Sequence, residues 1–119
     1  MAKKIYDLEE RTFLFAKNVR ITLSKFKYNV IQNEDIKQVT RSSGSIGANY
    51  IEANESLSKK DFIYRVKISR KEAKESIYWL RLLLSIKENE NKESLELLLL
   101  EAQELKKILS SILQKMETK

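Results

Sequence analysis

Two pairs of carboxylates are the groups in this sequence that could do chemistry. Glu52 and Glu55 are three residues apart, as are Glu72 and Glu75. On a helix this spacing places both carboxylates of a pair on one face. Two such pairs on neighbouring helices could hold Mg²⁺ and promote cleavage of a phosphoanhydride bond. A metal-dependent hydrolase is therefore one interpretation of the chain.

The same acids have a structural interpretation, which we favour. Buried polar groups are usually paired, and such pairs can set the register of packed helices. In this interpretation a cluster of paired polar residues ties the second helix to the third: Arg41, Asn49, Glu52, Glu72 and Glu75. Although all-α nucleotide pyrophosphohydrolases are similar in their paired acids, we expect no catalytic residue, no cofactor and no metal ion in this chain.

The composition excludes most other reaction chemistry. The 119 residues include no histidine and no cysteine, which removes imidazole bases, thiolate nucleophiles, zinc-finger ligands and disulfides. A di-iron bundle site is also excluded, because its Glu-x-x-His element needs histidine. The hydrophobic share of 42% is too high for a disordered chain, and apolar runs such as Leu97 to Leu100 are far too short to span a membrane. We therefore expect one soluble, cytoplasmic domain over residues 1–119, with no membrane partner.

Positive charge is concentrated in one segment of the chain. The net charge is +6, and residues 58–87 hold nine Lys or Arg but only three acids. Four lysines of this segment fall at helical spacings of seven, four and three, so they share one face. With two basic residues near the N-terminus they form a predicted nucleic-acid-binding surface: Lys60, Lys67, Lys71, Lys74, Lys17 and Arg20. The alternative is that these residues only keep an apolar oligomer soluble.

The C-terminal half carries more apolar residues than one core stripe needs. A monomer that exposed a second stripe would risk aggregation, so we expect a contact between subunits. The predicted interface residues are Tyr78, Trp79, Leu82, Ile86, Leu97 and Leu100. A closed ring needs two different surfaces that meet across subunits. The alternative is a broad core face with scattered exposed leucines.

The elements that must position these residues are four helices. With only two glycines and no proline, the chain lacks the turn residues of a sandwich or barrel, which predicts an all-α fold. Asp7 with Glu10 fits a capping box, and Ser58 with Asp61 fits an N-cap. Apolar periodicity predicts helices over about 7–27, 35–56, 59–87 and 92–117. Their short links make an antiparallel bundle.

The segment 42–48 has a low helix propensity, because Gly44 and Gly47 each disfavour a helix by up to about 1 kcal/mol relative to alanine. A flexible loop is the alternative. We favour a helix, because the apolar pattern keeps its phase on both sides of the glycines. The small residues Gly47 and Ala48 would then allow the first or third helix to approach closely.

Three separated motifs carry a family resemblance. They are Gln38-Val-Thr-Arg-Ser-Ser-Gly-Ser-Ile-Gly-Ala-Asn-Tyr-Ile-Glu-Ala53, Ser58-Lys-Lys-Asp-Phe-Ile63 and Lys71-Glu-Ala-Lys-Glu-Ser-Ile-Tyr-Trp-Leu80. In this order and spacing they resemble the bacterial four helix bundle protein family, also called the 23S rRNA-intervening sequence protein family. The likeness covers residues 38–84, while the first and last helices agree only in length and pattern.

The resemblance implies a left-handed up-down-up-down bundle that assembles into a ring, commonly a pentamer, and has no established catalytic activity. The accessory variability determinant of diversity-generating retroelements is similar, and there a basic pentameric barrel is associated with reverse transcriptase and nucleic acid. We therefore expect a non-enzymatic homopentamer that binds RNA or DNA, or a nucleic-acid-associated protein, without reading sequence. A protein-interaction scaffold and the Mg²⁺-dependent pyrophosphohydrolase remain the alternatives.

Overall fold

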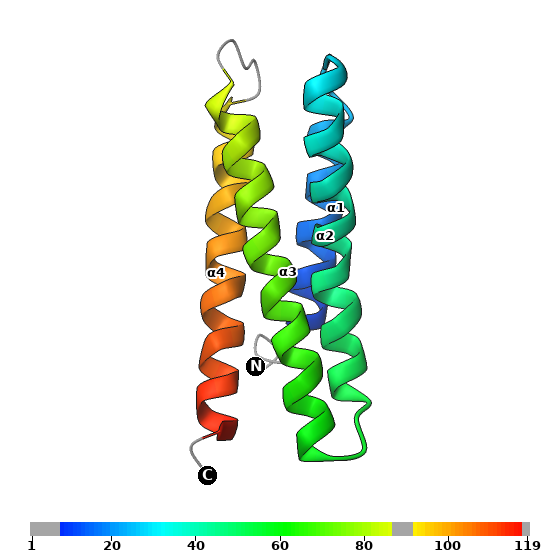
Figure 1. Cartoon of the computed structure of the whole chain (residues 1–119), viewed down its shortest axis with the longest axis vertical. Coiled ribbons are helices and arrows are strands. Elements are labelled where there is room, and N and C mark those ends of the chain that lie inside the picture. Colours follow the sequence, from blue (N-terminus) through cyan, green and yellow to red (C-terminus); the bar gives the residue numbers. More distant parts are fainter. Residues whose placement is uncertain (1–7, 87–91, 118–119) are drawn as a thin grey trace.

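The computed structural model describes residues 8–86 and 92–117 of the chain. These residues contain four helices and no strand: α1 (Leu8–Leu23), α2 (Val30–Asn54), α3 (Lys59–Ser85) and α4 (Lys92–Glu117) (Figure 1). The predicted all-α class is therefore confirmed for the part of the chain that the structure describes. Asp7 and Lys87 lie outside the described residues, and with them the predicted capping box at the start of the first helix.

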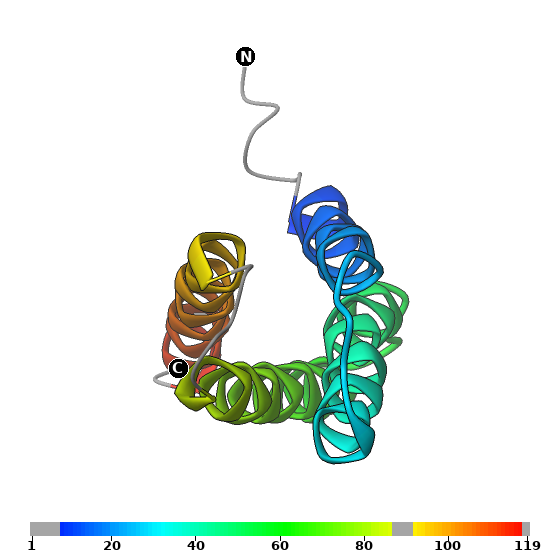
Figure 2. The same ribbon diagram turned by 90° about the horizontal axis from the view of Figure 1, so that it is seen from above.

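The four helices lie side by side along the long axis of the molecule. The colour gradient in Figure 1 shows that each helix runs in the opposite direction to the one before it. Seen from above, the helices follow one another in chain order around the molecule (Figure 2). The most extensive contact joins α2 to α3, and the contact between α1 and α4 is the least extensive of the four. This arrangement leaves one long side of every helix free of other helices.

The core lies between the helices and is built from one apolar stripe on each of them. Every stripe recurs at steps of three, four or seven residues, which is the period of a helix face. The larger side chains that are almost fully buried are Phe15, Val19, Val39, Ile46, Val66, Leu80, Leu83, Leu95, Leu105, Leu109 and Leu113. Leu57 is an apolar residue outside this core, because α2 ends at Asn54 and leaves the leucine 97% exposed.

The boundary between α1 and α2 differs from the prediction. The first helix ends at Leu23 instead of residue 27, and the second begins at Val30 instead of residue 35. The physical reason is a capping box, formed by Asn29 and Gln32, that was not predicted. The Asn29 side chain accepts a hydrogen bond from the Gln32 backbone N–H at 2.9 Å, and the Gln32 side chain accepts one from the Asn29 N–H at 3.3 Å. This capping box starts α2 at Val30, within residues 28–34, which the predicted bounds leave between the first two helices.

The glycine-containing segment 42–48 is helical, as predicted, and lies in the middle of α2. Gly47 is buried and faces Thr12 of α1, whereas Ala48 is exposed. Glycine therefore permits a close approach of α2 to α1 at this position. Within the described residues, no helix is both long and apolar enough to cross a membrane.

Candidate functional site

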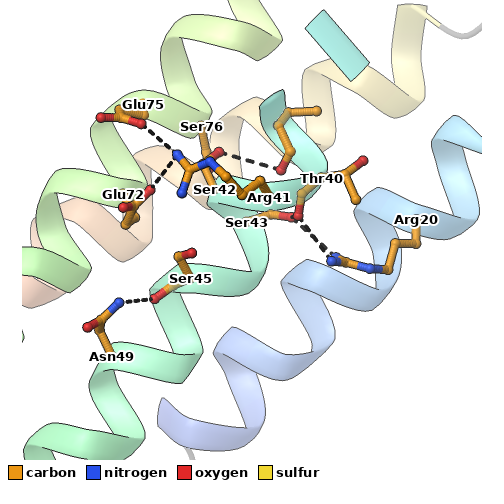
Figure 3. A network of polar contacts seen from close by, with 11 residues as sticks. Arg20, Thr40, Arg41, Ser42, Ser43, Ser45, Asn49, Glu72, Glu75 and Ser76 are labelled. Carbon is orange, nitrogen blue, oxygen red and sulfur yellow. Dashed lines mark hydrogen bonds and ion pairs between the residues drawn. The ribbon is translucent and has the colours of Figure 1, made fainter. Parts of the chain in front are cut away.

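The paired acids of α3 are engaged by an arginine of α2. Arg41 Nη2 donates hydrogen bonds to Glu72 Oε1 at 3.1 Å and to Glu75 Oε1 at 2.9 Å (Figure 3). Glu72 is buried with only 8% of its surface exposed, while Arg41 and Glu75 are more accessible. A buried carboxylate needs such a partner, because an unpaired buried charge is strongly unfavourable. These three residues of the predicted cluster therefore link α2 to α3.

Asn49 and Glu52 lie elsewhere on α2. The Asn49 amide donates to the Ser45 carbonyl oxygen at 2.9 Å, and its side-chain oxygen accepts from Arg65 at 3.2 Å. Glu52 is exposed, and its carboxylate has no hydrogen bond or ion pair within the described residues. It borders a shallow hollow with Glu55 at the C-terminal end of α2. The structure thus places Glu52 outside the polar cluster, because it is exposed about three helical turns beyond Arg41 on α2.

Serine hydroxyls make a second link between α2 and α3, which was not predicted. The buried hydroxyls of Ser42 and Ser76 are 2.7 Å apart (Figure 3). Ser69 Oγ donates to the backbone carbonyl oxygen of Ile46 at 2.7 Å. These small side chains let the two helices come close while keeping every hydroxyl paired. The helical spacing of serines on the buried faces was the available sequence signal.

The two acidic pairs do not share a site. Glu72 and Glu75 face Arg41, whereas Glu52 and Glu55 lie at the end of α2 near Asp61. Among the described residues, no group of three or more acidic side chains is arranged to hold a metal ion. The two acids of α3 therefore take part in the contact between α2 and α3.

The outer side of α3 forms a broad, open hollow with a volume of about 1010 Å³. Six basic side chains border it: Lys67, Arg70, Lys71, Lys74, Arg81 and Lys106. Glu75 is the acid among its lining residues, and that carboxylate is paired with Arg41. We call this feature the α3 basic hollow. Three of the predicted lysines lie together in it: Lys67, Lys71 and Lys74. Arg70, Arg81 and Lys106 also border it and were not predicted, because they do not belong to the lysine row of one helix face.

Most cations of the α3 basic hollow have no acidic partner. Lys67 Nζ lies 3.1 Å from Glu117 Oε2, and both side chains are about half exposed. Within the described residues, the other five cations of the hollow make no ion pair. Close like charges repel one another, and an anion that bound between them would relieve this repulsion. The hollow is therefore a surface of unneutralised positive charge.

The remaining predicted cations lie away from the hollow. Lys60 is exposed in the first turn of α3. Lys17 borders a different surface, between α1 and α2. Arg20 extends across the same helix pair and donates to the Thr40 carbonyl oxygen at 3.0 Å, so it joins α1 to α2 (Figure 3). The six predicted cations thus do not form one continuous surface.

The predicted interface residues also divide into groups, which lie on different parts of the molecule. Tyr78 and Trp79 border the α3 basic hollow, and their rings meet edge to face with centroids 5.0 Å apart. Leu97 and Leu100 are 68% and 57% exposed on α4. Leu97 lies beside α1, in a groove of about 400 Å³. The other two residues, Leu82 and Ile86, are half-buried near the C-terminal end of α3.

A further apolar surface covers α1 and was not predicted. Phe13, Leu14 and Ile21 are between 42% and 59% exposed. Phe13 and Ile21 border an almost wholly apolar groove of about 520 Å³ between α1 and α2, together with Gly47 and Ile51. The apolar residues that lie between the buried positions of α1 were the sequence signal for this surface.

An ion pair limits the groove between α1 and α4. Arg11 Nε donates to Glu101 Oε2 at 2.6 Å, and its Nη2 donates to Oε1 at 3.0 Å. This hydrogen bonding raises the pKa of the Arg11 guanidinium above its ordinary value, against a smaller lowering by burial. The bidentate pair is the polar link where α1 and α4 meet.

Comparison with known proteins identifies relatives over most of the chain. The model of the 23S rRNA-intervening sequence protein family matches residues 4–111. A crystal structure of a protein of unknown function from the S23 ribosomal protein family of Bacteroides thetaiotaomicron is similar, with 34% sequence identity and a TM-score of 0.74. The match covers 88% of this chain and 96% of that protein. None of the curated proteins matches the chain.

Proposed function

The chain belongs to the family of 23S rRNA-intervening sequence proteins, and we propose that it is a non-enzymatic, ring-forming protein that binds RNA through the basic face of α3. The observation that carries this proposal is the α3 basic hollow, in which Lys71, Lys74 and Arg81 border one open surface and have no acidic partner within the described residues. Phosphate groups are the ligands that such a surface attracts most strongly.

The binding is expected to be independent of base sequence. Lysine and arginine side chains that face phosphates set the position of a nucleic acid but read no base edges. Lys60 and Lys67 extend the basic face along α3 toward its N-terminal end. An RNA or an RNA-containing assembly is the preferred partner, and we propose the cytoplasm as the location of the protein.

We further propose that the four helices form a left-handed up-down-up-down bundle and that five copies close into a ring. A ring needs two different surfaces on each subunit. The exposed leucines of α4, Leu97 and Leu100, supply one of them. The apolar groove between α1 and α2, bordered by Phe13 and Ile51, supplies the other. Repetition of a basic face around a ring strengthens weak phosphate contacts through avidity.

A mobility-shift titration tests the nucleic-acid proposal. A structured RNA, a single-stranded DNA and a duplex DNA are each incubated with up to about 10 µM protein at about 50 mM salt, where electrostatic binding is strong. We expect a shift with RNA that weakens steeply at higher salt. The absence of a shift with every probe would contradict the proposal and leave a protein-interaction scaffold as the function.

The scaffold is the second candidate, because the apolar groove between α1 and α2 could also receive another protein. A Mg²⁺-dependent nucleotide pyrophosphohydrolase is the weaker candidate, since Arg41 already engages two of its four acids. Calorimetric titration with Mg²⁺ and Mn²⁺, followed by a nucleoside triphosphate hydrolysis assay, distinguishes it. Tight metal binding with hydrolysis would overturn the non-enzymatic assignment.

A further inference from the structure

The α3 basic hollow contains an exposed aromatic ring among its cations. Tyr78 is 54% exposed and borders the hollow. Lys74 and Arg81 lie four residues before and three residues after it, so both cations are its neighbours on the same helix face. A surface that only attracts phosphates through lysines does not require an aromatic ring. An exposed aromatic face beside phosphate-binding cations is the arrangement by which proteins hold unpaired bases.

The ring of Tyr78 is in contact with the ring of Trp79. Their rings meet at an interplanar angle of 77°, and Trp79 itself is partly buried against the core. Such edge-to-face contacts restrict the orientation of an exposed ring. The Trp79 Nε1–H is buried and has no hydrogen-bond partner among the described residues. A buried donor without an acceptor is unfavourable, so this corner of the hollow carries a polar group that the described part of the chain leaves unsatisfied.

We propose that the hollow is a subsite for single-stranded nucleic acid, in which one base stacks on Tyr78 and the flanking phosphates lie against Lys74 and Arg81. This inference rests on the proposed function and adds to it the kind of nucleic acid that is bound. Bases in a duplex are stacked on each other and cannot reach a protein ring, whereas an unpaired base can. The ring therefore selects single strands, loops or bulges over paired segments.

The length of the basic face suits a strand of several nucleotides. Lys67 and Arg81 are separated by about 21 Å along α3 at a helical rise of 1.5 Å per residue. Lys67, Lys71 and Lys74 follow one another at roughly one helical turn, and Arg81 lies about two turns after Lys74. Because every base has a π-face, stacking on Tyr78 adds affinity without selecting a base. This property agrees with binding that does not read sequence.

Fluorescence of Trp79 reports binding at this site directly, because it is the chain's single tryptophan and lies against Tyr78. The protein is titrated with an oligouridylate of about ten nucleotides, with an abasic ribose-phosphate chain of equal length, with a duplex of equal length and with free UTP. We expect the oligouridylate to bind about 5- to 100-fold more tightly than the abasic chain, which is the range that stacking of one base provides. The duplex and UTP should bind more weakly than the oligouridylate.

Variants at Tyr78 separate stacking from simple charge attraction. Tyr78→Ala should reduce oligouridylate affinity to that of the abasic chain, while Tyr78→Phe should keep the full affinity. Tyr64→Ala is the matched control, because Tyr64 is also on α3 and 60% exposed but lies outside the hollow. Helix content measured by circular dichroism should be unchanged in all three variants, since both tyrosines are largely exposed.

The outcomes separate the two proposals. If the abasic chain binds as tightly as the oligouridylate, or if Tyr78→Ala has no more effect than Tyr64→Ala, the stacking subsite is wrong while RNA binding by the basic face stands. If free UTP binds as tightly as the oligouridylate, the hollow is a mononucleotide site and the assignment to a strand is wrong. If none of the nucleic acids binds, both proposals fall.

Discussion

Gly47 of α2 faces Thr12 of α1 so closely that a Cβ atom added at residue 47 would lie 2.8 Å from Thr12 Oγ1. The Thr12 hydroxyl donates to the Glu9 carbonyl oxygen at 2.8 Å, which holds it in place. The same Cβ would lie 3.2 Å from Thr12 Cβ, an atom that cannot move without its backbone. The two helices can therefore keep their spacing only with glycine at this position.

The first prediction is that Gly47→Leu destabilises the fold. Overpacking of this kind should lower the free energy of unfolding by about 1 to 3 kcal/mol. Gly44→Ala is the control, because its Cβ would meet only the guanidinium end of Arg20, at 3.2 Å. Gly44→Ala should instead raise the free energy of unfolding by up to about 1 kcal/mol, because alanine has a higher helix propensity than glycine. Thermal unfolding followed by circular dichroism measures both, and equal melting temperatures for the two variants would contradict the close contact.

The second prediction concerns the buried carboxylate of Glu72. Arg41→Met removes its partner and should lower the free energy of unfolding by about 1 to 3 kcal/mol, the cost of leaving a buried acceptor unsatisfied. Adding Glu72→Gln to this variant should restore part of the loss, because the unpaired charge is then gone. Glu75→Gln alone should change stability by less than about 1 kcal/mol, since this carboxylate is more exposed.

Urea unfolding of the single and double variants measures the coupling between Arg41 and Glu72. If Arg41→Met were as stable as the parent, the cluster would not tie α2 to α3. If the double variant were less stable than Arg41→Met, the loss would come from side-chain packing instead of the buried charge.

The third prediction is that the leucines of α4 hold subunits together. Leu97→Glu and Leu100→Glu place a charge on the surface that we assign to the ring contact, so they should shift the protein to smaller species. Leu57→Glu is a matched control, because Leu57 is 97% exposed and borders neither apolar groove. Sedimentation velocity at micromolar concentration measures the species. A parent protein that sediments as a monomer would contradict the ring.

Local sequence signals predicted most of the fold. The N-cap at Ser58 was identified, and its side chain accepts from the Asp61 backbone N–H as expected. The helix through Gly44 and Gly47 could be predicted because the apolar phase survives on both sides. The start of α2 was missed, because Val30 and Ile31 do not lie on the apolar stripe of the helix and are 82% and 68% exposed in the structure. The spacing of Asn29 and Gln32, which equals that of Asp7 and Glu10, was the sequence signal that could have found it.

The candidate site was less predictable than the fold. Spacing along one helix found Lys67, Lys71 and Lys74, but Lys106 comes from α4 and joins them only through helix packing. The excess of apolar residues placed Tyr78 and Leu97 in one predicted interface, although the two residues border different surfaces in the folded chain. Which residues share a surface depends on how the helices pack, and a periodicity within one helix carries no information on its neighbours.

The most direct test of the central claim is the salt dependence of RNA affinity for two charge-matched variants. One changes Lys67, Lys71 and Lys74 to glutamine, and the other changes Lys25, Lys27 and Lys37, which border neither the α3 basic hollow nor the groove between α1 and α2. Both lose the same net charge, so the comparison separates a binding surface from general attraction. Fluorescence anisotropy with a labelled single-stranded RNA gives the affinity at each salt concentration.

We predict that the α3 variant loses affinity and that its log-log salt slope falls by about 2, because each phosphate contact contributes about 0.7 for a single strand. The control variant should keep the slope of the parent. Equal slopes and affinities for the two variants, or the absence of RNA binding by the parent at low salt, would contradict the claim that the basic face of α3 binds nucleic acid.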